Sequence, residues 1–507
     1  MRVRFVLRGD RRLLLTALTG LLTACGTTVP AAQQTSLPGP DGGGLQPAGA
    51  GQTQAPLTTT SGNGASAVDG GSSVQGGAGT GTSVSAQNPG PQGAQGHPGT
   101  TGTQVRVGPG VTATTIAIGY QYVRVGSSGT KAVTGKDVSI GDPEAMARAV
   151  TDWINTHGGL GGKRMVLQPF GVDYGQYVSN AQVSYSTICS HFTADVKVLA
   201  VGLYVPDRNE LTCLSRKGVL SISDGYNLDR SAFDDAFPTT YWSPGSMSQD
   251  RGAELGVAGL WDAHFLTSTS KVGILRYDET SYARAEKSLR AALARHGLSA
   301  ITNTVSYDST SAGESDAAAA VLKFRAAGIT HVMVLDNSGG ITYAFMQAAE
   351  SQQYRPYYAL TTNNSPQALA QLAPATQLAK AQAVSWWSGD VGTRTDQISP
   401  PAIPSSRASC LKIMTSHGVD ISGSATGTAL ITCDQLLVLK AVLDRGAVPS
   451  AAGMTSTLET LGTSYTSPLS YGSRFARHEH DAAYVTRRIR FDSSCSCWLY
   501  AGPGPHA

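Results

Sequence analysis

Two short segments combine residue types that bind phosphate or metal in other proteins. Segment 158–164 places four glycines before Lys163, as phosphate-binding loops do. However, it follows a predicted helix instead of a strand, and Arg164 stands where such a loop needs Ser or Thr. We therefore expect the glycines to end the helix in left-handed conformations and to turn the chain into the next strand.

Segment 477–481 reads Arg-His-Glu-His-Asp, which holds two histidines and two acids. Residues two apart point the same way only on a strand, and no distant third ligand can be argued for. A solvated turn before the last strand is the favoured interpretation. No metal site is predicted.

Catalytic motifs are missing from the sequence. There is no G-x-S-x-G or H-E-x-x-H motif, and the ten histidines and 35 acidic residues form no recognised pairing. We expect a protein that is not an enzyme and needs no cofactor. An extracellular hydrolase is kept as a minor alternative.

The N-terminal segment is typical of an export signal. It has an arginine-rich start and an apolar run at 13–22, which is too short to span a bilayer. The motif LTAC ending at Cys25 resembles the lipobox of bacterial lipoproteins, in which the chain is cut before the cysteine and the thiol receives a lipid. We expect a signal peptide at 1–24 and a lipoprotein anchored through Cys25 to the outer face of the cell membrane. An ordinary signal peptide with an incidental cysteine is the alternative, and a twin-arginine signal fits poorly.

Loss of this segment changes the net charge. The whole chain carries a formal charge of +3, and the residues before Cys25 include five arginines and one aspartate, so the mature chain carries −1. A nearly neutral chain lacks the basic surface that nucleic acid requires, so we expect no nucleic-acid partner.

Six cysteines remain when Cys25 is assigned to lipid. An even number in an exported chain favours disulfides. Proximity in sequence favours Cys189 with Cys213 and Cys410 with Cys433. The last two, at positions 495 and 497, would close a very small loop, so they are either a labile disulfide or two free thiols.

The composition changes near residue 110. Residues 25–110 are mostly Gly, Ser, Thr, Gln, Ala and Pro with few large apolar side chains, a composition that predicts a disordered linker. It would serve either as a tether between the lipid and the folded part or as a passive spacer through a cell wall.

Beyond residue 110, short apolar runs alternate with amphipathic stretches, which predicts βαβ units and parallel sheets. The expected strands are 115–119, 164–171, 196–202, 218–223, 271–275, 331–336 and 483–491. The expected helices are 142–155, 180–192, 207–216, 282–296, 315–327, 406–417 and 429–445. The pattern restarts at residue 271, so we expect an α/β protein with two lobes.

Segment 154–164, INTHGGLGGKR, resembles the turn after the first helix in type I periplasmic binding proteins of the branched-chain amino-acid-binding family. The similarity continues in register over the whole folded region. It implies two doubly wound parallel-sheet lobes joined by three crossover segments, near 241–245, 383–387 and 464–471. Lobe one is then 111–244 plus 387–466, and lobe two is 245–386 plus 467–500.

Ligands of open α/β sheets bind at the carboxyl ends of the strands, and the resemblance points to the same positions. The candidate contacts of lobe one are Tyr122, Tyr204, Val205, Gly225 and Asn227. Those of lobe two are Tyr282, Asp336, Asn337 and Thr362. The family's hydroxyl donor is replaced by Tyr204 or Val205, and its acid by Thr362, so Asp336 is the candidate substitute carboxylate.

The resemblance implies a solute-binding protein that captures a small polar molecule, such as an amino acid or an amide, for an ABC-type importer. The expected partners are the solute, the membrane through Cys25 and an ABC permease. A cell-surface sensor with the same fold and no role in transport is the alternative.

Overall fold

The computed structural model describes residues 107–124, 139–173, 181–204, 206–224, 228–306, 310–391 and 404–502. All of them belong to the C-terminal unit of the chain, Pro98–Ala507. The predicted signal peptide, the lipid attachment at Cys25 and nearly all of the predicted linker lie outside the described residues.

The first sheet is entirely parallel and has the strand order β2-β1-β3-β4-β5. Its strands are β1 (Thr115–Arg124), β2 (Arg164–Asp173), β3 (Ala200–Gly202), β4 (Leu220–Ile222) and β5 (Tyr241–Trp242). This order has a topological switch point between β1 and β3, next to which ligands bind in doubly wound folds.

The second sheet has the order β12-β11-β10-β9-β8-β6-β7. Its parallel strands are β6 (Val272–Tyr277), β7 (Ala300–Val305), β8 (His331–Leu335), β9 (Tyr357–Thr361) and β10 (Gln382–Ser385). Two antiparallel strands, β11 (Arg487–Asp492) and β12 (Cys497–Tyr500), complete one edge.

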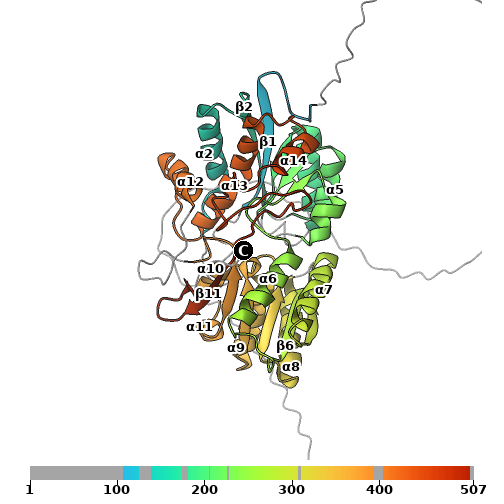
Figure 1. Ribbon diagram of the computed structural model, residues 1–507, viewed down its shortest axis with the longest axis vertical. Coiled ribbons are helices and arrows are strands. Elements are labelled where there is room, and N and C mark those ends of the chain that lie inside the picture. The colour runs from blue at the N-terminus through green and yellow to red at the C-terminus, as the bar shows by residue number, and fades with distance from the viewer. Residues whose placement is uncertain are drawn as a thin grey trace, which may run out of the picture. The chain divides into compact units, whose positions relative to one another are not determined.

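Helices cover both sheets (Figure 1). The first lobe contains α2 (Pro143–Thr156), α4 (Ala181–Ser190), α5 (Arg208–Arg216), α12 (Ser405–Ser416), α13 (Ala425–Asp444) and α14 (Ala451–Leu458). The second contains α6 (Gln249–Asp262), α7 (Thr280–Ala294), α8 (Thr310–Ala326), α9 (Gly340–Ser351), α10 (Pro366–Leu372) and α11 (Ala375–Leu378). Short π- and 3-10 turns occur at His191–Asp195, Ala232–Ala236 and Thr362–Asn364. The predicted α/β class with two lobes is confirmed.

Local sequence explains the start and the end of α2. Asp142 caps the helix by accepting a hydrogen bond from the backbone N–H of Ala145 at 3.0 Å, and Pro143 occupies the first turn. Gly158 and Gly159 follow the helix with φ of 92° and 70°, conformations that favour glycine. The glycine-rich segment therefore ends a helix, as the sequence predicted.

The chain passes between the sheets three times: after β5, after β10 and before β11. Ser243 of the first passage forms a parallel bridge with Asp481 of the third. Trp387 of the second passage forms an antiparallel bridge with Ser470 of the third. The three crossover segments are thus joined by backbone pairing.

The helix α13 is long and apolar enough to cross a membrane, but 72% of its most apolar window is buried inside the protein. It packs in the core of the first lobe beside α2 and α12. The apolar character of α13 is thus explained by burial within the lobe.

Candidate functional site

The strand ends of both sheets carry most of the residues that the sequence predicted to contact a ligand. Tyr204 follows β3, Asp336 and Asn337 follow β8, Thr362 follows β9, and Tyr282 lies in the first turn of α7. Val205, Gly225 and Asn227 lie outside the described residues.

A buried carboxylate joins the two lobes near these strand ends. Asp229, between β4 and β5 of the first lobe, is 1% exposed and accepts hydrogen bonds from Arg208 and Ser231 of its own lobe, each at 2.5 Å. From the second lobe, Ser281 donates to Asp229 Oδ1 at 3.0 Å, and Arg284 donates to Oδ2 at 3.2 Å. The start of α7 is thereby bonded to the first lobe.

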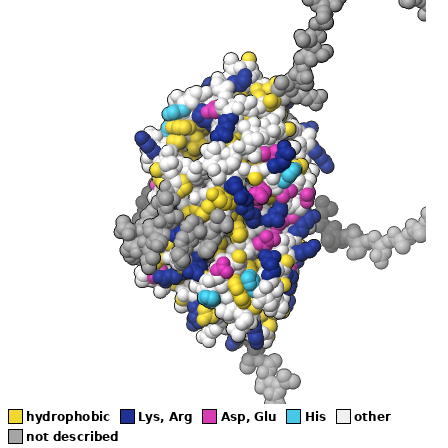
Figure 2. Space-filling model, in the orientation of Figure 1, with side chains coloured by type: hydrophobic (Ala, Val, Ile, Leu, Met, Phe, Trp, Pro, Cys, Tyr) yellow, Lys and Arg dark blue, Asp and Glu magenta, His cyan; other side chains and the backbone are white. Residues whose placement is uncertain are grey.

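Its donors keep the carboxylate of Asp229 ionised. We call the cluster formed by this carboxylate and its four donors, Arg208, Ser231, Ser281 and Arg284, the Asp229 clasp. Burial acts to raise the pKa of Asp229, but hydrogen bonds from Ser231 and Arg208 outweigh burial and lower the pKa. Acidic and basic side chains gather on the molecular face where the two lobes meet (Figure 2). Because each lobe supplies part of the clasp, it stabilises the arrangement in which the lobes are in contact.

Tyr282 and Tyr204 remain compatible with a ligand-binding role. Tyr282 is 5% exposed, and its ring packs edge to face against Tyr277 with the centroids 5.2 Å apart. Tyr204 is partly exposed, and its backbone N–H donates to Gln121 Oε1 at 2.8 Å. Tyr204 follows β3 of the first lobe, and Tyr282 lies in the helix after β6 of the second, so the two candidate contacts come from different lobes.

Tyr122 has a packing role in the structure. It lies inside β1, which continues to Arg124 instead of ending at residue 119, and its ring covers Gly171 of β2. Its hydroxyl donates to Glu144 of α2. Burial and the bond to Glu144 raise the pKa of Tyr122 to about 12. The tyrosine thus joins β1 to α2.

The carboxylate of Asp336 accepts hydrogen bonds from the loop that follows it. Oδ1 accepts hydrogen bonds from the backbone N–H groups of Asn337 (2.7 Å) and Ser338 (3.2 Å). Oδ2 accepts from both the N–H (3.0 Å) and the hydroxyl (2.8 Å) of Thr342. The side chain is fully buried, so Asp336 fixes the loop that begins α9. Four internal donors weaken the case for a direct bond to a solute.

Thr362 is also fully buried and bonded within the protein. Its hydroxyl donates to Asp390 Oδ2 at 2.7 Å and accepts from the backbone N–H of Trp386 at 3.0 Å. Burial raises the pKa of Asp390 to about 7, although hydrogen bonds from Thr362 and Ser385 oppose the rise. Thr362 therefore links the end of β9 to the second crossover.

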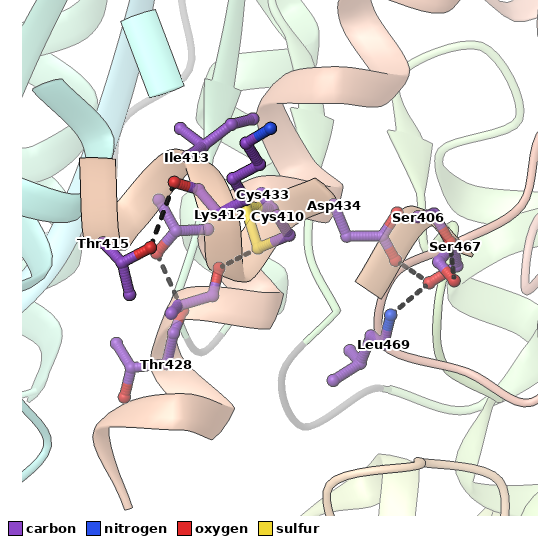
Figure 3. Close-up of a disulfide and its surroundings, with 12 residues drawn as sticks. Ser406, Cys410, Lys412, Ile413, Thr415, Thr428, Cys433, Asp434, Ser467 and Leu469 are labelled. Atoms are coloured by element: carbon purple, nitrogen blue, oxygen red, sulfur yellow. Dashed lines mark hydrogen bonds between the residues drawn. A yellow bond between two sulfur atoms is a disulfide. The ribbon is translucent and has the colours of Figure 1, made fainter. Parts of the chain in front are cut away.

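Two further buried acids, Asp224 and Asp434, lie next to the first and third crossovers. Asp224, at the end of β4, accepts a hydrogen bond from the backbone N–H of Gly245 at 2.6 Å. Asp434 of α13 accepts from Tyr465 Oη at 2.6 Å and from Ser467 Oγ, and Figure 3 shows Asp434 pointing toward Ser467. Both acids are 0% exposed, and Asp224 Oδ2 has no hydrogen-bond partner in the described part of the chain.

Burial of two neighbouring carboxyl groups indicates that the pair of Asp224 and Asp434 holds a proton. Burial and the neighbouring carboxyl group of Asp434 raise the pKa of Asp224 well above its usual range. Burial likewise raises the pKa of Asp434. A proton between the two carboxyl groups gives the unbonded Asp224 oxygen a partner. The pair was not predicted from the sequence, although the strand-end rule that selected Gly225 applies equally to Asp224.

The prediction of a solvated turn at 477–481 is wrong for its last two residues. His480 is 1% exposed and stacks on Trp242 with the ring centroids 4.2 Å apart. Asp481 is 5% exposed, accepts from the N–H of Ser248 at 2.8 Å and pairs with Arg251 at 3.2 Å. The third crossover buries these residues because it pairs with the first. In the described residues no group of three or more His, Cys, Asp or Glu side chains is placed to hold a metal ion.

Three disulfides are present. Cys189 of α4 is bonded to Cys213 of α5, and Cys410 of α12 to Cys433 of α13 (Figure 3). The third joins Cys495, in the turn after β11, to Cys497, the first residue of β12. The first two disulfides each connect neighbouring helices of the first lobe.

No family model matches the sequence, and no curated protein matches it either. Solved structures do match the fold. A branched-chain amino acid ABC transporter protein from Thermus thermophilus with bound valine is 14% identical, with a TM-score of 0.56, over 78% of this chain and 96% of the other. A fatty acid ABC transporter substrate-binding protein from Thermomonospora curvata is 14% identical, with a TM-score of 0.56, over 78% and 94%.

A third match is an ABC transporter solute-binding protein from Rhodopseudomonas palustris in complex with p-hydroxybenzoic acid. It is 11% identical, with a TM-score of 0.55, and the match covers 77% of this chain and 97% of the other. The described part of the chain therefore has the fold of type I periplasmic binding proteins. Because the three proteins are named for different ligands, the fold by itself leaves the ligand open.

Proposed function

We propose that this chain is an exported solute-binding protein that captures a small polar molecule between its lobes and delivers it to an ABC-type importer. The observation that carries the proposal is the Asp229 clasp. It forms only when strand ends of the two lobes come together, which is the arrangement that encloses a solute. Binding without chemistry is sufficient for this role.

The proposed site has an aromatic and a polar component. Tyr204 from the first lobe and Tyr282 from the second provide apolar surface and hydroxyl groups. Val205, Gly225 and Asn227 complete the first side, and Asn337 provides an amide on the second. Asp336 and Thr362 support this site through their loops, because their side chains are occupied within the protein.

The remaining sequence predictions extend the proposal to the rest of the chain. The lobe boundaries remain 111–244 plus 387–466 and 245–386 plus 467–500. Cys25 is proposed to carry the lipid, with 25–110 as the tether at the outer face of the membrane. Replacement Cys25→Ser should move the protein from the membrane fraction to the soluble fraction, and full retention in the membranes would contradict the anchor.

A thermal-shift screen tests solute binding. The purified chain is melted with branched-chain and other amino acids, amides, hydroxybenzoates, fatty acids, polyamines and short peptides. A true solute at about one hundred times its Kd should stabilise the folded state by about 2.7 kcal/mol. If a folded chain is stabilised by no member of these classes, the proposal of a small-solute site is wrong.

One variant and its control distinguish a loss of solute binding from a loss of folding. Tyr282→Ala should weaken solute binding at least tenfold, because an aromatic side of the site is lost. Tyr354→Ala removes a tyrosine on the far side of the second lobe, whose hydroxyl donates to Ile329 O, and should leave affinity unchanged. Uptake of the labelled solute by cells with and without the gene then distinguishes transport from sensing.

A further inference from the structure

The disulfide between Cys495 and Cys497 differs from the other two in its environment. It closes the turn of the β11–β12 hairpin at the edge of the second sheet. Both cysteines are partly exposed, and the serines at 493, 494 and 496 are exposed. By contrast, Cys410 and Cys433 are 0% exposed, and in the remaining disulfide Cys189 is 1% exposed while Cys213 is partly exposed, so each of these two disulfides has at least one buried sulfur. A dissolved thiol can therefore approach the hairpin disulfide without unfolding of the protein.

The loop that this disulfide closes is very short. The cysteines are separated by 2 positions, against 24 and 23 in the other two disulfides. A disulfide stabilises a fold mainly by restricting the unfolded chain, and this effect is smaller for a shorter loop. Ser496, inside the loop, has a φ of 49°, a left-handed conformation that is unfavourable for a non-glycine residue. Little folding energy is therefore lost when this bond opens.

The hairpin has its own anchors, which do not depend on the disulfide. Residues Arg490 and Phe491 of β11 pair with Leu499 and Trp498 of β12. Trp498 is 1% exposed, packs against Phe491, and donates from Nε1 to the carbonyl of Pro366 at 2.6 Å. The hairpin can thus stay in place in both the oxidised and the reduced state, as a reversible redox site requires.

We propose that Cys495–Cys497 is a redox-active surface disulfide that exchanges with low-molecular-mass thiols. A thiolate RS⁻ attacks one of the two sulfurs, an RS–S bond forms, and the S–S bond breaks. The other cysteine leaves as a thiolate and takes a proton from water. A second thiolate then releases RSSR and the second cysteine, so two thiols are oxidised while the disulfide gains two electrons and two protons.

This activity is separate from the proposed solute site. The hairpin lies at the β12 edge of the second sheet, whereas Tyr282 of the proposed site belongs to α7, which follows β6 near the opposite edge. Failure of the solute screen would therefore leave the redox proposal untouched, and the reverse also holds.

The test equilibrates the full chain with graded ratios of reduced to oxidised glutathione at neutral pH, then traps thiols with an alkylating reagent and maps the peptides. We expect Cys495 and Cys497 to be reduced, or to carry glutathione, in buffers that leave Cys189–Cys213 and Cys410–Cys433 oxidised. Their reduction should be at least tenfold faster than that of the two helix-linking disulfides. If all three disulfides open together, or the hairpin disulfide opens last, the proposal is overturned.

A variant provides the second measurement. Cys495→Ser leaves Cys497 without its partner, and we expect Cys497 to form a mixed disulfide with oxidised glutathione that mass spectrometry detects on the folded protein. The double variant Cys495→Ser with Cys497→Ser should form no adduct and keep the melting temperature of the parent within a few degrees. Absence of the adduct on the single variant would also overturn the proposal.

Discussion

Ser281 of the second lobe donates a hydrogen bond to the buried carboxylate of Asp229 in the first lobe at 3.0 Å. The two residues are far apart in sequence, and each adjoins a candidate ligand contact: Ser281 precedes Tyr282, and Asp229 follows Asn227 by two positions. The clasp therefore lies next in sequence to a candidate ligand contact of each lobe.

Arg284→Ala should shift the lobes toward the open arrangement. Arg284 donates to Asp229 across the interface but is half exposed, so its loss should cost about 1 kcal/mol, a factor of about five in the closed population. The matched control is Arg290→Ala on the same helix, whose partner Glu286 lies within the second lobe. Distances between fluorophores on the two lobes measure the effect. Equal opening in both variants would show that the clasp does not control closure.

The buried acids of the crossovers should make stability depend on pH. Burial raises the pKa of Asp224, Asp434 and Asp390, the last to about 7, so the folded state binds protons that the unfolded chain releases above about pH 4. Their contribution is fully present below the unfolded pKa and is lost as pH rises toward and through the folded pKa. Asp390 and the proton held by the Asp224–Asp434 pair each lower the free energy of unfolding by about 1.4 kcal/mol per pH unit within their windows.

Asp434→Asn tests this pH dependence, because the amide mimics the protonated acid. Urea unfolding between about pH 5 and 8 should show a shallower loss of stability in the variant than in the parent. Acids with lowered pKa values, such as Asp229, act in the opposite direction but are common to both proteins. An unchanged slope would mean that Asp434 is ionised in the folded state.

Gly245→Ala should strain the first crossover. A Cβ at this position would lie 2.3 Å from Asp434 Oδ2 and 2.7 Å from Ser467 Oγ, so the buried acid or the backbone has to move. We expect a loss of about 1–3 kcal/mol. Gly427→Ala in α13 is the matched control, because its Cβ meets nothing within 4 Å. Because Gly427 lies in the first turn of α13, the replacement should leave the stability unchanged or raise it slightly. Melting curves that show equal effects would contradict the crowding at Gly245.

Asp336→Ala should destabilise the loop before α9 and so lower the free energy of unfolding. The variant leaves the donors of Asn337, Ser338 and Thr342 without their acceptor, for an expected loss of about 2 kcal/mol or more in the free energy of unfolding. Asn337→Ala, on the neighbouring partly exposed position, should cost less than about 0.5 kcal/mol. A fully stable Asp336→Ala protein with lost solute affinity would instead support a direct contact.

The helix α6 shows why some elements could not be predicted from the sequence. It contains Gly252, Gly256 and Gly259, which lower helix propensity, and it was not predicted. In the structure a Cβ at Gly252 would come within 2.9 Å of the Trp386 ring, and one at Gly259 within 2.8 Å of Val384. The glycines that obscure the helix are the ones that let it lie close to β10.

The sequence by itself determined the α/β class, the two lobes and the glycine turn at 158–164, because strand and helix periodicities and left-handed glycines are local properties. It also placed candidate ligand contacts at strand ends by a general rule. Only the tertiary structure decided which polar groups have their hydrogen-bond partners inside the protein: Asp336 is bonded within the second lobe and Thr362 to the second crossover, whereas Asp229 bridges the lobes. Burial and hydrogen-bond partners depend on contacts between distant segments, such as Asp224 and Asp434 around Gly245, and no local pattern records them.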